Sequence, residues 1–119
     1  MAGDVRREVG TAGEDAVAVW YEARGYTILD RNWRVRAGEI DLVVARAGTV
    51  VFCEVKTRRG NAFGAPFEAV TAQKQRRLRG LAAAWLAQQP LGRRDLRFDV
   101  ASVTPNGAGW TVDVIEAAF

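Results

Sequence analysis

Histidine is absent from this chain of 119 residues, and cysteine occurs once. Without histidine, the chain can form neither a Ser-His-Asp triad nor a zinc site with histidine ligands. The single cysteine, Cys53, cannot form an intrachain disulfide, and its place in an apolar segment predicts a packing role. Any hydrolytic chemistry must therefore depend on carboxylates, lysine or a bound metal ion.

Long apolar segments are also missing. No run approaches the roughly 20 apolar residues that cross a bilayer, and residues 1–10 are too polar and charged for a signal peptide. Together with the unpaired cysteine, these absences predict a cytoplasmic protein without a membrane partner.

Lysine is scarce, although the chain is basic. Of the 17 lysine and arginine residues, only Lys56 and Lys74 are lysines, which favours a specific role for Lys56. The net charge of +3 suits a polyanionic partner but is too small to establish one. The length allows one domain with a hydrophobic core.

The most informative segment is residues 38–57, whose composition predicts a β-hairpin. Residues 39–45 and 49–56 are rich in apolar and β-branched side chains, and Gly48 marks a turn between them. A two-residue loop, or one of four residues, places Asp41 opposite Glu54 and Glu39 opposite Lys56. A three-residue loop would shift this register by one, and a bulge would be needed to restore it.

In the favoured register, two carboxylates lie opposite each other on one face. At about 4 Å they would repel by roughly 4 kcal/mol at an effective dielectric constant near 20. A divalent cation between them would reverse the sign, and carboxylate oxygens are ligands that Mg²⁺ prefers. Lys56 would then stand beside the metal, able to orient a water molecule. The alternative, a solvated polar face with an ordinary Glu39–Lys56 pair, has equal weight on spacing alone.

A helix is expected from Ala12 to Arg24, after a flexible tail over residues 1–9. Thr11 and Glu14 have the spacing of a capping box, and Gly25 suits the end of the helix. Glu14 therefore has two interpretations. The pattern favours the capping box, and the alternative is a third acidic ligand that projects over the sheet.

Basic residues occur on three further segments. The strand expected over 26–36, with a bend near Asn32, carries arginines beside Trp33. The glycine-rich segment 58–66 is placed to close over a substrate or is a plain connector. The helix expected over 72–89, with Thr71 as N-cap, has a basic first half. The strand and the helix each either contact the phosphates of a nucleic acid or present a solvated basic face. The candidate nucleic-acid contacts are Arg34, Arg36, Arg58, Arg59, Gln73, Lys74 and Arg77.

Two short strands, over 96–103 and 110–115, complete the chain. Asp99 lies between apolar residues and is expected to have a structural role, holding an arginine. The order of elements is αβββαββ, which predicts a single-domain α/β sandwich over residues 10–119 with a central mixed sheet. The helix before the fourth strand makes a crossover, so the strand with Glu54 should be central.

The acidic residue of one strand followed by E-x-K in the next resembles the PD-(D/E)xK nuclease superfamily, whose fold is restriction-endonuclease-like. Ile40 stands where the superfamily has proline. The whole set of motifs resembles the YraN family of small bacterial endonuclease-like proteins, which are similar in fold to the dimeric archaeal Holliday-junction resolvases. The motifs are Gly38-Glu39-Ile40-Asp41-Leu42-Val43, Phe52-Cys53-Glu54-Val55-Lys56-Thr57-Arg58, Gly13-Glu14-Asp15-Ala16, Val70-Thr71 with Lys74-Gln75-Arg76-Arg77-Leu78, Arg97-Phe98-Asp99-Val100 and Ala118-Phe119.

The resemblance implies roles for individual residues. Asp41 and Glu54 would bind a catalytic Mg²⁺, for which Mn²⁺ can substitute, together with the backbone carbonyl of Val55. Lys56 would position or activate the attacking water, and Glu14 would hold a second metal ion or its waters. Gln73 and Lys74 would approach a substrate phosphate. The candidate metal ligands are Asp41, Glu54, Val55, Glu14 and Glu39, and the candidate catalytic residues are Asp41, Glu54, Lys56 and Glu14.

Two functions remain open at this point. The leading expectation is a Mg²⁺-dependent DNA endonuclease that acts on branched or flapped DNA in repair or recombination. The alternative is a nucleic-acid-binding module that keeps the nuclease fold without catalysis. A nuclease of this size that cuts two strands suits a homodimer, although no surface of the sequence can be assigned to an interface.

Overall fold

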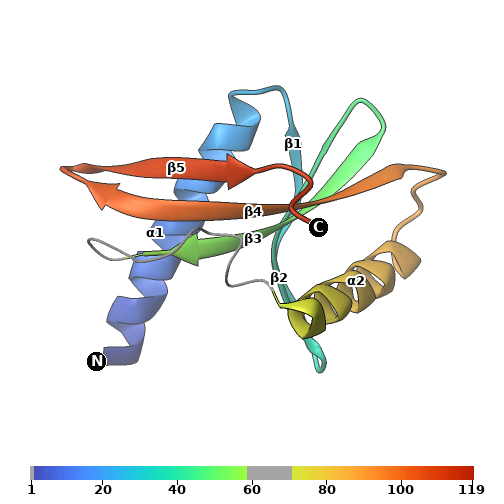
Figure 1. Cartoon of the computed structure of the whole chain (residues 1–119), viewed down its shortest axis with the longest axis horizontal. Coiled ribbons are helices and arrows are strands. Elements are labelled where there is room, and N and C mark those ends of the chain that lie inside the picture. The colour runs from blue at the N-terminus through green and yellow to red at the C-terminus, as the bar shows by residue number, and fades with distance from the viewer. Residues whose placement is uncertain (1, 59–70) are drawn as a thin grey trace.

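The computed structural model describes the backbone of residues 2–58 and 71–119, and the side chains of residues 11–58 and 71–119. In these ranges the chain forms two helices and a five-stranded sheet (Figure 1). The elements are α1 (Ala2–Glu22), β1 (Thr27–Val35), β2 (Gly38–Arg46), β3 (Thr49–Thr57), α2 (Ala72–Ala87), β4 (Asp95–Asn106) and β5 (Gly109–Ile115). The predicted α/β fold and its αβββαββ order are therefore confirmed.

The sheet has the order β1-β2-β3-β4-β5, so the strand with Glu54 is central, as predicted. Strands β3 and β4 are parallel, and the other neighbouring pairs are antiparallel. A parallel pair needs a crossover connection, and α2 lies between β3 and β4 in the chain. The segment 59–70 lies outside the described residues, and with it Arg59 and most of the predicted glycine-rich loop.

The β2–β3 hairpin has the register that the sequence favoured. Arg46 pairs with Thr49, and the ladder continues to the pair of Leu42 with Cys53. The two-residue turn has φ values of 49° at Ala47 and 83° at Gly48. Both values are left-handed, as in the tight hairpin turns that match the twist of the strands, and glycine adopts this conformation without steric cost.

Helix α1 begins at Ala2 rather than at Ala12, which corrects the predicted start. Thr11 therefore lies within the helix and is not its N-cap, so the capping-box interpretation of Glu14 is wrong. The spacing of a capping box also occurs inside helices, where the backbone N–H groups already have partners. The backbone of residues 2–9 is helical where the sequence predicted a tail.

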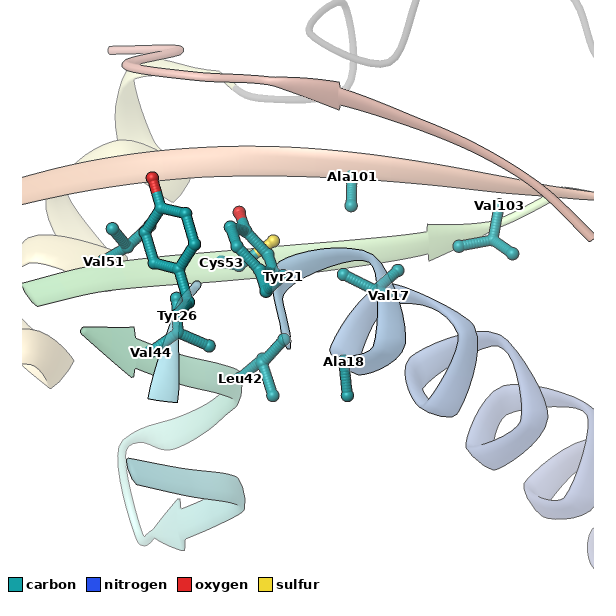
Figure 2. Packing of buried hydrophobic residues seen from close by; sticks show 10 residues of the cluster. All are labelled: Val17, Ala18, Tyr21, Tyr26, Leu42, Val44, Val51, Cys53, Ala101 and Val103. Carbon is teal, nitrogen blue, oxygen red and sulfur yellow. The ribbon is translucent and has the colours of Figure 1, made fainter. Parts of the chain in front are cut away.

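Buried apolar residues pack on both faces of the sheet. On the α1 face, Val17 and Tyr21 contact a cluster that includes Leu42 and Cys53 (Figure 2). Cys53 is 1% exposed, which agrees with its predicted packing role. The cluster on the α2 face consists of Ile40, Val43, Val50, Phe52, Leu81, Ala82, Trp85 and Phe98. The two clusters fix α1 and α2 to opposite faces of the sheet.

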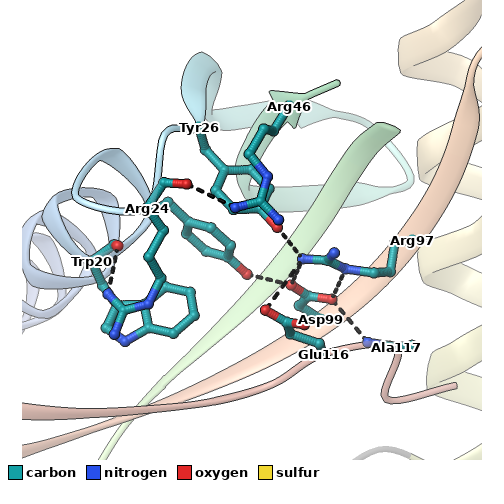
Figure 3. A network of polar contacts seen from close by, with 9 residues as sticks. Trp20, Arg24, Tyr26, Arg46, Arg97, Asp99, Glu116 and Ala117 are labelled. Atoms are coloured by element: carbon teal, nitrogen blue, oxygen red, sulfur yellow. Dashed lines mark hydrogen bonds and ion pairs between the residues drawn. The ribbon is translucent and has the colours of Figure 1, made fainter. Parts of the chain in front are cut away.

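Asp99 is buried at the centre of a polar network that joins α1, β4 and the C-terminal segment (Figure 3). Its carboxylate accepts hydrogen bonds from Tyr21 Oη at 2.6 Å and from the backbone N–H of Ala117 at 3.0 Å. Arg97 donates to both carboxylate oxygens at 2.9 Å. The predicted structural role of Asp99, holding an arginine, is confirmed.

Candidate metal centre and nucleic-acid interface

Strand β2 is irregular at Asp41, where it stops pairing with β3 in the usual way. Ile40 packs in the cluster on the α2 face, whereas Leu42 packs on the α1 face. Two residues at this spacing share a face in a regular strand, so the alternation breaks between them. The β2–β3 ladder ends at the pair of Leu42 with Cys53, and beyond it Asp41 Oδ2 accepts the backbone N–H of Val55 at 2.8 Å. A side chain thus replaces the backbone acceptor between the two strands.

Glu14 reaches this point from α1, on the face opposite α2. The helix comes very close to the end of β3 at Gly13, where an added Cβ would lie 2.6 Å from Thr57 Oγ1. A glycine is therefore needed for this approach. On β1, Asn32 has a left-handed φ of 52°, at the predicted bend, and its side chain hydrogen-bonds to Glu14.

Three carboxylates converge where these elements meet. Ligand oxygens of Glu14, Glu39 and Asp41 all lie within 4.8 Å of one another, and all three side chains are half-buried. Glu14 and Asp41 were predicted ligands, and Glu39 was a further candidate. The structure brings these three together from α1 and β2, which is an arrangement that repels unless a cation or a proton is present.

Burial first, and that repulsion second, shift the protonation of Asp41 and Glu14. Burial raises the pKa of Asp41 to about 6, the charges of Glu14, Glu39 and Glu54 add to the rise, and the Val55 hydrogen bond opposes it. Burial also raises the pKa of Glu14, against the Asn32 hydrogen bond, with a further contribution from Glu39.

The Oε2 atom of Glu14 is buried, and it receives no hydrogen bond within the described part of the chain. A buried acceptor without a donor is costly, and a cation would satisfy it. Oxygen-only ligands of this kind suit Mg²⁺ or Mn²⁺. The residues present therefore fit a hard divalent cation.

Glu54 lies near this cluster but has other partners. Its Oε1 is 2.7 Å from Lys74 Nζ and 3.4 Å from Lys56 Nζ. Its Oε2 is buried and has no hydrogen-bond donor within the described residues. The carboxylate of Glu54 is thus shared between β3, which supplies Lys56, and α2, which supplies Lys74. Its charge still acts on Asp41.

The two lysines differ in their protonation. Burial lowers the pKa of Lys56, and neighbouring Lys74 lowers it further against the attraction of Glu54. Burial is the largest influence on Lys74 and acts to lower its pKa, but the hydrogen bonds to Glu54 and Lys56 and the charge of Glu54 together outweigh it and leave the pKa raised. Lys74 therefore holds its positive charge more firmly, and Lys56 gives up a proton more easily.

Glu39 does not pair with Lys56, which was the ordinary alternative for the hairpin. Its Oε2 lies 3.0 Å from Arg34 Nε, across the β1–β2 ladder in which these two residues are partners. Arg34 is exposed, but its charge is directed at Glu39. If Arg34 contacts a phosphate as predicted, its guanidinium must bind the phosphate and the Glu39 carboxylate together.

The other predicted nucleic-acid residues lie in different settings. Arg36, Gln73 and Arg77 are exposed. Arg58 is half-buried at the end of β3, where its backbone N–H donates to the Val103 carbonyl at 2.8 Å. A cavity of about 350 Å³ lies at the start of α2, and among the described residues its lining is formed by Thr71, Gln73, Lys74 and Arg77. The predicted nucleic-acid contacts on α2 thus border one cavity, and one of them, Lys74, also contacts Glu54.

Comparison with known proteins finds similar sequences in one family. Residues 13–103 match the model of the family described as "Uncharacterised protein family UPF0102". The chain is 47% identical to a UPF0102 protein of Clavibacter michiganensis over 94% of this chain and 96% of that protein. It is 52% identical to a UPF0102 protein of Symbiobacterium thermophilum, with 87% of each chain covered. A UPF0102 protein of Acidothermus cellulolyticus is 42% identical over the whole of both chains.

The chain belongs to the UPF0102 family. This is the YraN-like, PD-(D/E)xK nuclease-like group that the sequence resembled, so that prediction is confirmed. The names of these UPF0102 relatives state no activity. Neither helix in the described part of this UPF0102 chain is long and apolar enough to cross a membrane.

Sequence reasoning missed two features of this UPF0102 site. One is the bond from Val55 N–H to Asp41, which follows from the irregular β2 strand. The other is the contact of Lys74 with Glu54. A signal for the second was present, because the chain has only two lysines and both are found at Glu54.

Proposed function

We propose that this protein is a divalent-metal-dependent endonuclease that hydrolyses phosphodiester bonds in DNA. The observation that carries the proposal is the convergence of half-buried carboxylates where β2 and β3 separate, near enough to Glu54 and its two lysines for the Glu54 charge to act on Asp41. Repelling acids are expensive to hold together in a fold, and a cation that balances them is a physical reason to keep them. Membership of a nuclease-like family supports the same reading.

In this proposal Mg²⁺, or Mn²⁺ in its place, is held by Asp41 and Glu14 with Glu39 beside them. Glu54 and the backbone carbonyl of Val55 complete the ligands from β3. When bound, the ion would supply Lewis-acid catalysis and positive charge for the reacting phosphate.

Lys56 is the residue best placed to handle a proton. Its pKa is lowered, chiefly by burial, so the neutral amine forms more easily than for an exposed lysine, and a neutral amine can accept a hydrogen bond or a proton from water. As an ammonium, it would instead stabilise negative charge on the phosphate in the transition state. Both roles need Lys56 at the reacting group rather than in DNA binding alone.

The basic residues would hold the substrate. Exposed Arg36, Arg77 and Gln73 can contact phosphates on either side of the reacting bond, and such contacts give affinity without reading sequence. The resemblance to resolvases makes branched or flapped DNA the first substrates to test. A homodimer would allow two such centres to cut two strands.

A second candidate function is a nucleic-acid-binding module without catalysis. The observation that favours it is that Glu54, a required ligand of the nuclease motif, is already neutralised by Lys74 and Lys56. If those ion pairs persist on DNA, no cation would use Glu54. The protein would then bind DNA through its arginines alone.

Cleavage assays separate the two functions. Labelled four-way junction, flap, single-stranded and duplex DNA would be incubated with Mg²⁺, Mn²⁺ or EDTA. Wild type is expected to cut at least one of these with metal only. Lys56→Ala and Asp41→Ala, purified in parallel, should bind DNA within about threefold of wild type when binding is measured in EDTA, and with metal they should lose at least about a hundredfold in cleavage rate. Cutting by both variants would reveal a contaminating nuclease, and no metal-dependent cutting by wild type would refute the enzyme proposal.

A further inference from the structure

Lys74 both contacts Glu54 and lines the basic cavity at the start of α2. Its Nζ lies 2.7 Å from Glu54 Oε1, and the two side chains are only 16% and 12% exposed. Lys56, at 3.4 Å from the same oxygen, is 31% exposed. Lys74 is therefore the closer and more buried of the two cations that neutralise Glu54.

The backbone holds Lys74 at this position. Thr71 is the N-cap of α2, and its hydroxyl accepts the backbone N–H of Lys74 at 3.1 Å. Lys74 also lines the cavity of about 350 Å³, together with Gln73 and Arg77. A four-carbon side chain anchored here can direct its ammonium either to Glu54 or into the cavity without movement of the helix.

The cavity and Glu54 would compete for this ammonium. A phosphate in the cavity would meet Gln73 and Arg77 as well as Lys74, whereas Glu54 offers one carboxylate. Loss of Lys74 from Glu54 leaves a largely buried carboxylate whose Oε2 has no donor within the described residues. Such a group strongly favours a replacement cation.

We propose that Lys74 is a positioning residue that exchanges partners, from Glu54 in the DNA-free protein to a backbone phosphate in the DNA complex, and thereby releases Glu54 to the divalent cation. This inference rests on the proposed function, because it takes the metal and DNA sites to be neighbours. Its consequence is that DNA and metal strengthen each other's binding. By linkage, the factor by which DNA raises metal affinity equals the factor by which metal raises DNA affinity.

Mn²⁺ binding to the full-length chain tests the exchange without any need for cleavage. Free Mn²⁺ would be measured by electron paramagnetic resonance, with and without a phosphorothioate-linked DNA duplex that resists hydrolysis. For wild type, DNA is expected to raise Mn²⁺ affinity by about fivefold or more. Lys74→Gln should bind Mn²⁺ about fivefold more tightly than wild type without DNA, and DNA should add little. Lys74→Arg, which keeps the charge, should resemble wild type.

Arg76→Gln is the matched control, because it removes the same charge from an exposed position on α2. It should weaken DNA binding but leave the wild-type coupling factor. Circular dichroism would establish that each variant is folded. The inference is overturned if Lys74→Gln binds Mn²⁺ no more tightly than wild type without DNA, or if it keeps the full coupling.

A second variant tests the exchange with no metal present. In EDTA, Glu54→Gln leaves Lys74 without its carboxylate, so DNA affinity measured by fluorescence anisotropy should rise by more than in Glu22→Gln. Glu22 is an exposed residue of α1, and its substitution changes the net charge equally. Equal effects of the two substitutions would overturn the exchange.

The outcomes for the two proposals differ. Coupled binding of Mn²⁺ and DNA without cleavage of any substrate would refute the endonuclease and support the exchange. Cleavage by wild type, with unchanged coupling between Mn²⁺ and DNA binding in Lys74→Gln, would support the endonuclease and refute the exchange. No Mn²⁺ binding by wild type at millimolar concentration would overturn both.

Discussion

Asp41→Asn should stabilise the metal-free protein above pH 6. Asparagine keeps an oxygen that can accept the Val55 N–H, but it carries no charge to be buried or to repel Glu14 and Glu39. The sign follows from linkage. A carboxyl whose pKa rises on folding makes the folded state bind protons more tightly, so stability falls as pH rises from the unfolded to the folded pKa.

The size of this stabilisation follows from the pKa values of Asp41 in the folded and unfolded protein. The pKa of Asp41 is about 6 in the folded protein against 3.8 for an unperturbed aspartate. That difference corresponds to about 3 kcal/mol. Because the side chain is partly exposed, solvent screening reduces it, and we expect about 1–2 kcal/mol. For a chain of this length, that stabilisation raises the melting temperature by about 4–8 °C.

Thermal and urea unfolding in EDTA, followed by circular dichroism between pH 4 and pH 8, measure the effect. The advantage of Asp41→Asn should be small at pH 4, grow through the range up to about pH 6 and then level off. Asp113→Asn, at an exposed position of β5, is the control and should change stability by less than about 0.5 kcal/mol. With millimolar Mg²⁺ or Mn²⁺ at pH 8, wild type should gain stability and Asp41→Asn should not.

One result would refute this reasoning. If Asp41→Asn is less stable than wild type at pH 8 in EDTA, the Asp41 carboxylate is stabilising in its folded setting. The carboxylates would then be ordinary members of a polar network, and they would provide no physical argument for a metal.

Two further predictions concern the framework of the site. Asp99→Ala should destabilise the fold by about 3–5 kcal/mol, because it leaves Arg97 and Tyr21 without their acceptor, and urea unfolding would measure this. A loss below about 1 kcal/mol would contradict the structural role of the network. Thr71→Ala should cost about 1 kcal/mol through loss of the α2 cap, while Thr71→Ser should cost little. Equal loss in both would show that the hydroxyl of Thr71 is not the stabilising group.

Local pattern was enough to predict the framework of this protein. Alternating and β-branched residues located the strands, and Gly48 located the turn that fixes the register from Arg46–Thr49 to Leu42–Cys53. The helix between the hairpin and the fourth strand required a crossover and hence a central β3. These features follow from periods of 2 and 3.6 residues and from turn chemistry, which are properties of short segments.

The partners of the charged residues depended on tertiary structure. Glu54 was expected opposite Asp41, and it lies against Lys74 because α2 crosses that face of β3. Glu39 was expected opposite Lys56, and it pairs with Arg34 across the β1–β2 ladder. A pattern in one strand gives the face of a side chain, but the choice among several charges on that face depends on how distant elements cross.

The sequence by itself determined which residues are available for the proposed chemistry: three carboxylates and one lysine on the hairpin, in a chain with no histidine. Only the tertiary structure decided how they are grouped. The break in β2 at Asp41 and the close approach of α1 at Gly13 bring Glu14, Glu39 and Asp41 together. The physical reason is that packing contacts on both faces of the sheet position these side chains to within a few ångströms. Those contacts join elements that are far apart in the chain, so no single segment of the sequence contains them.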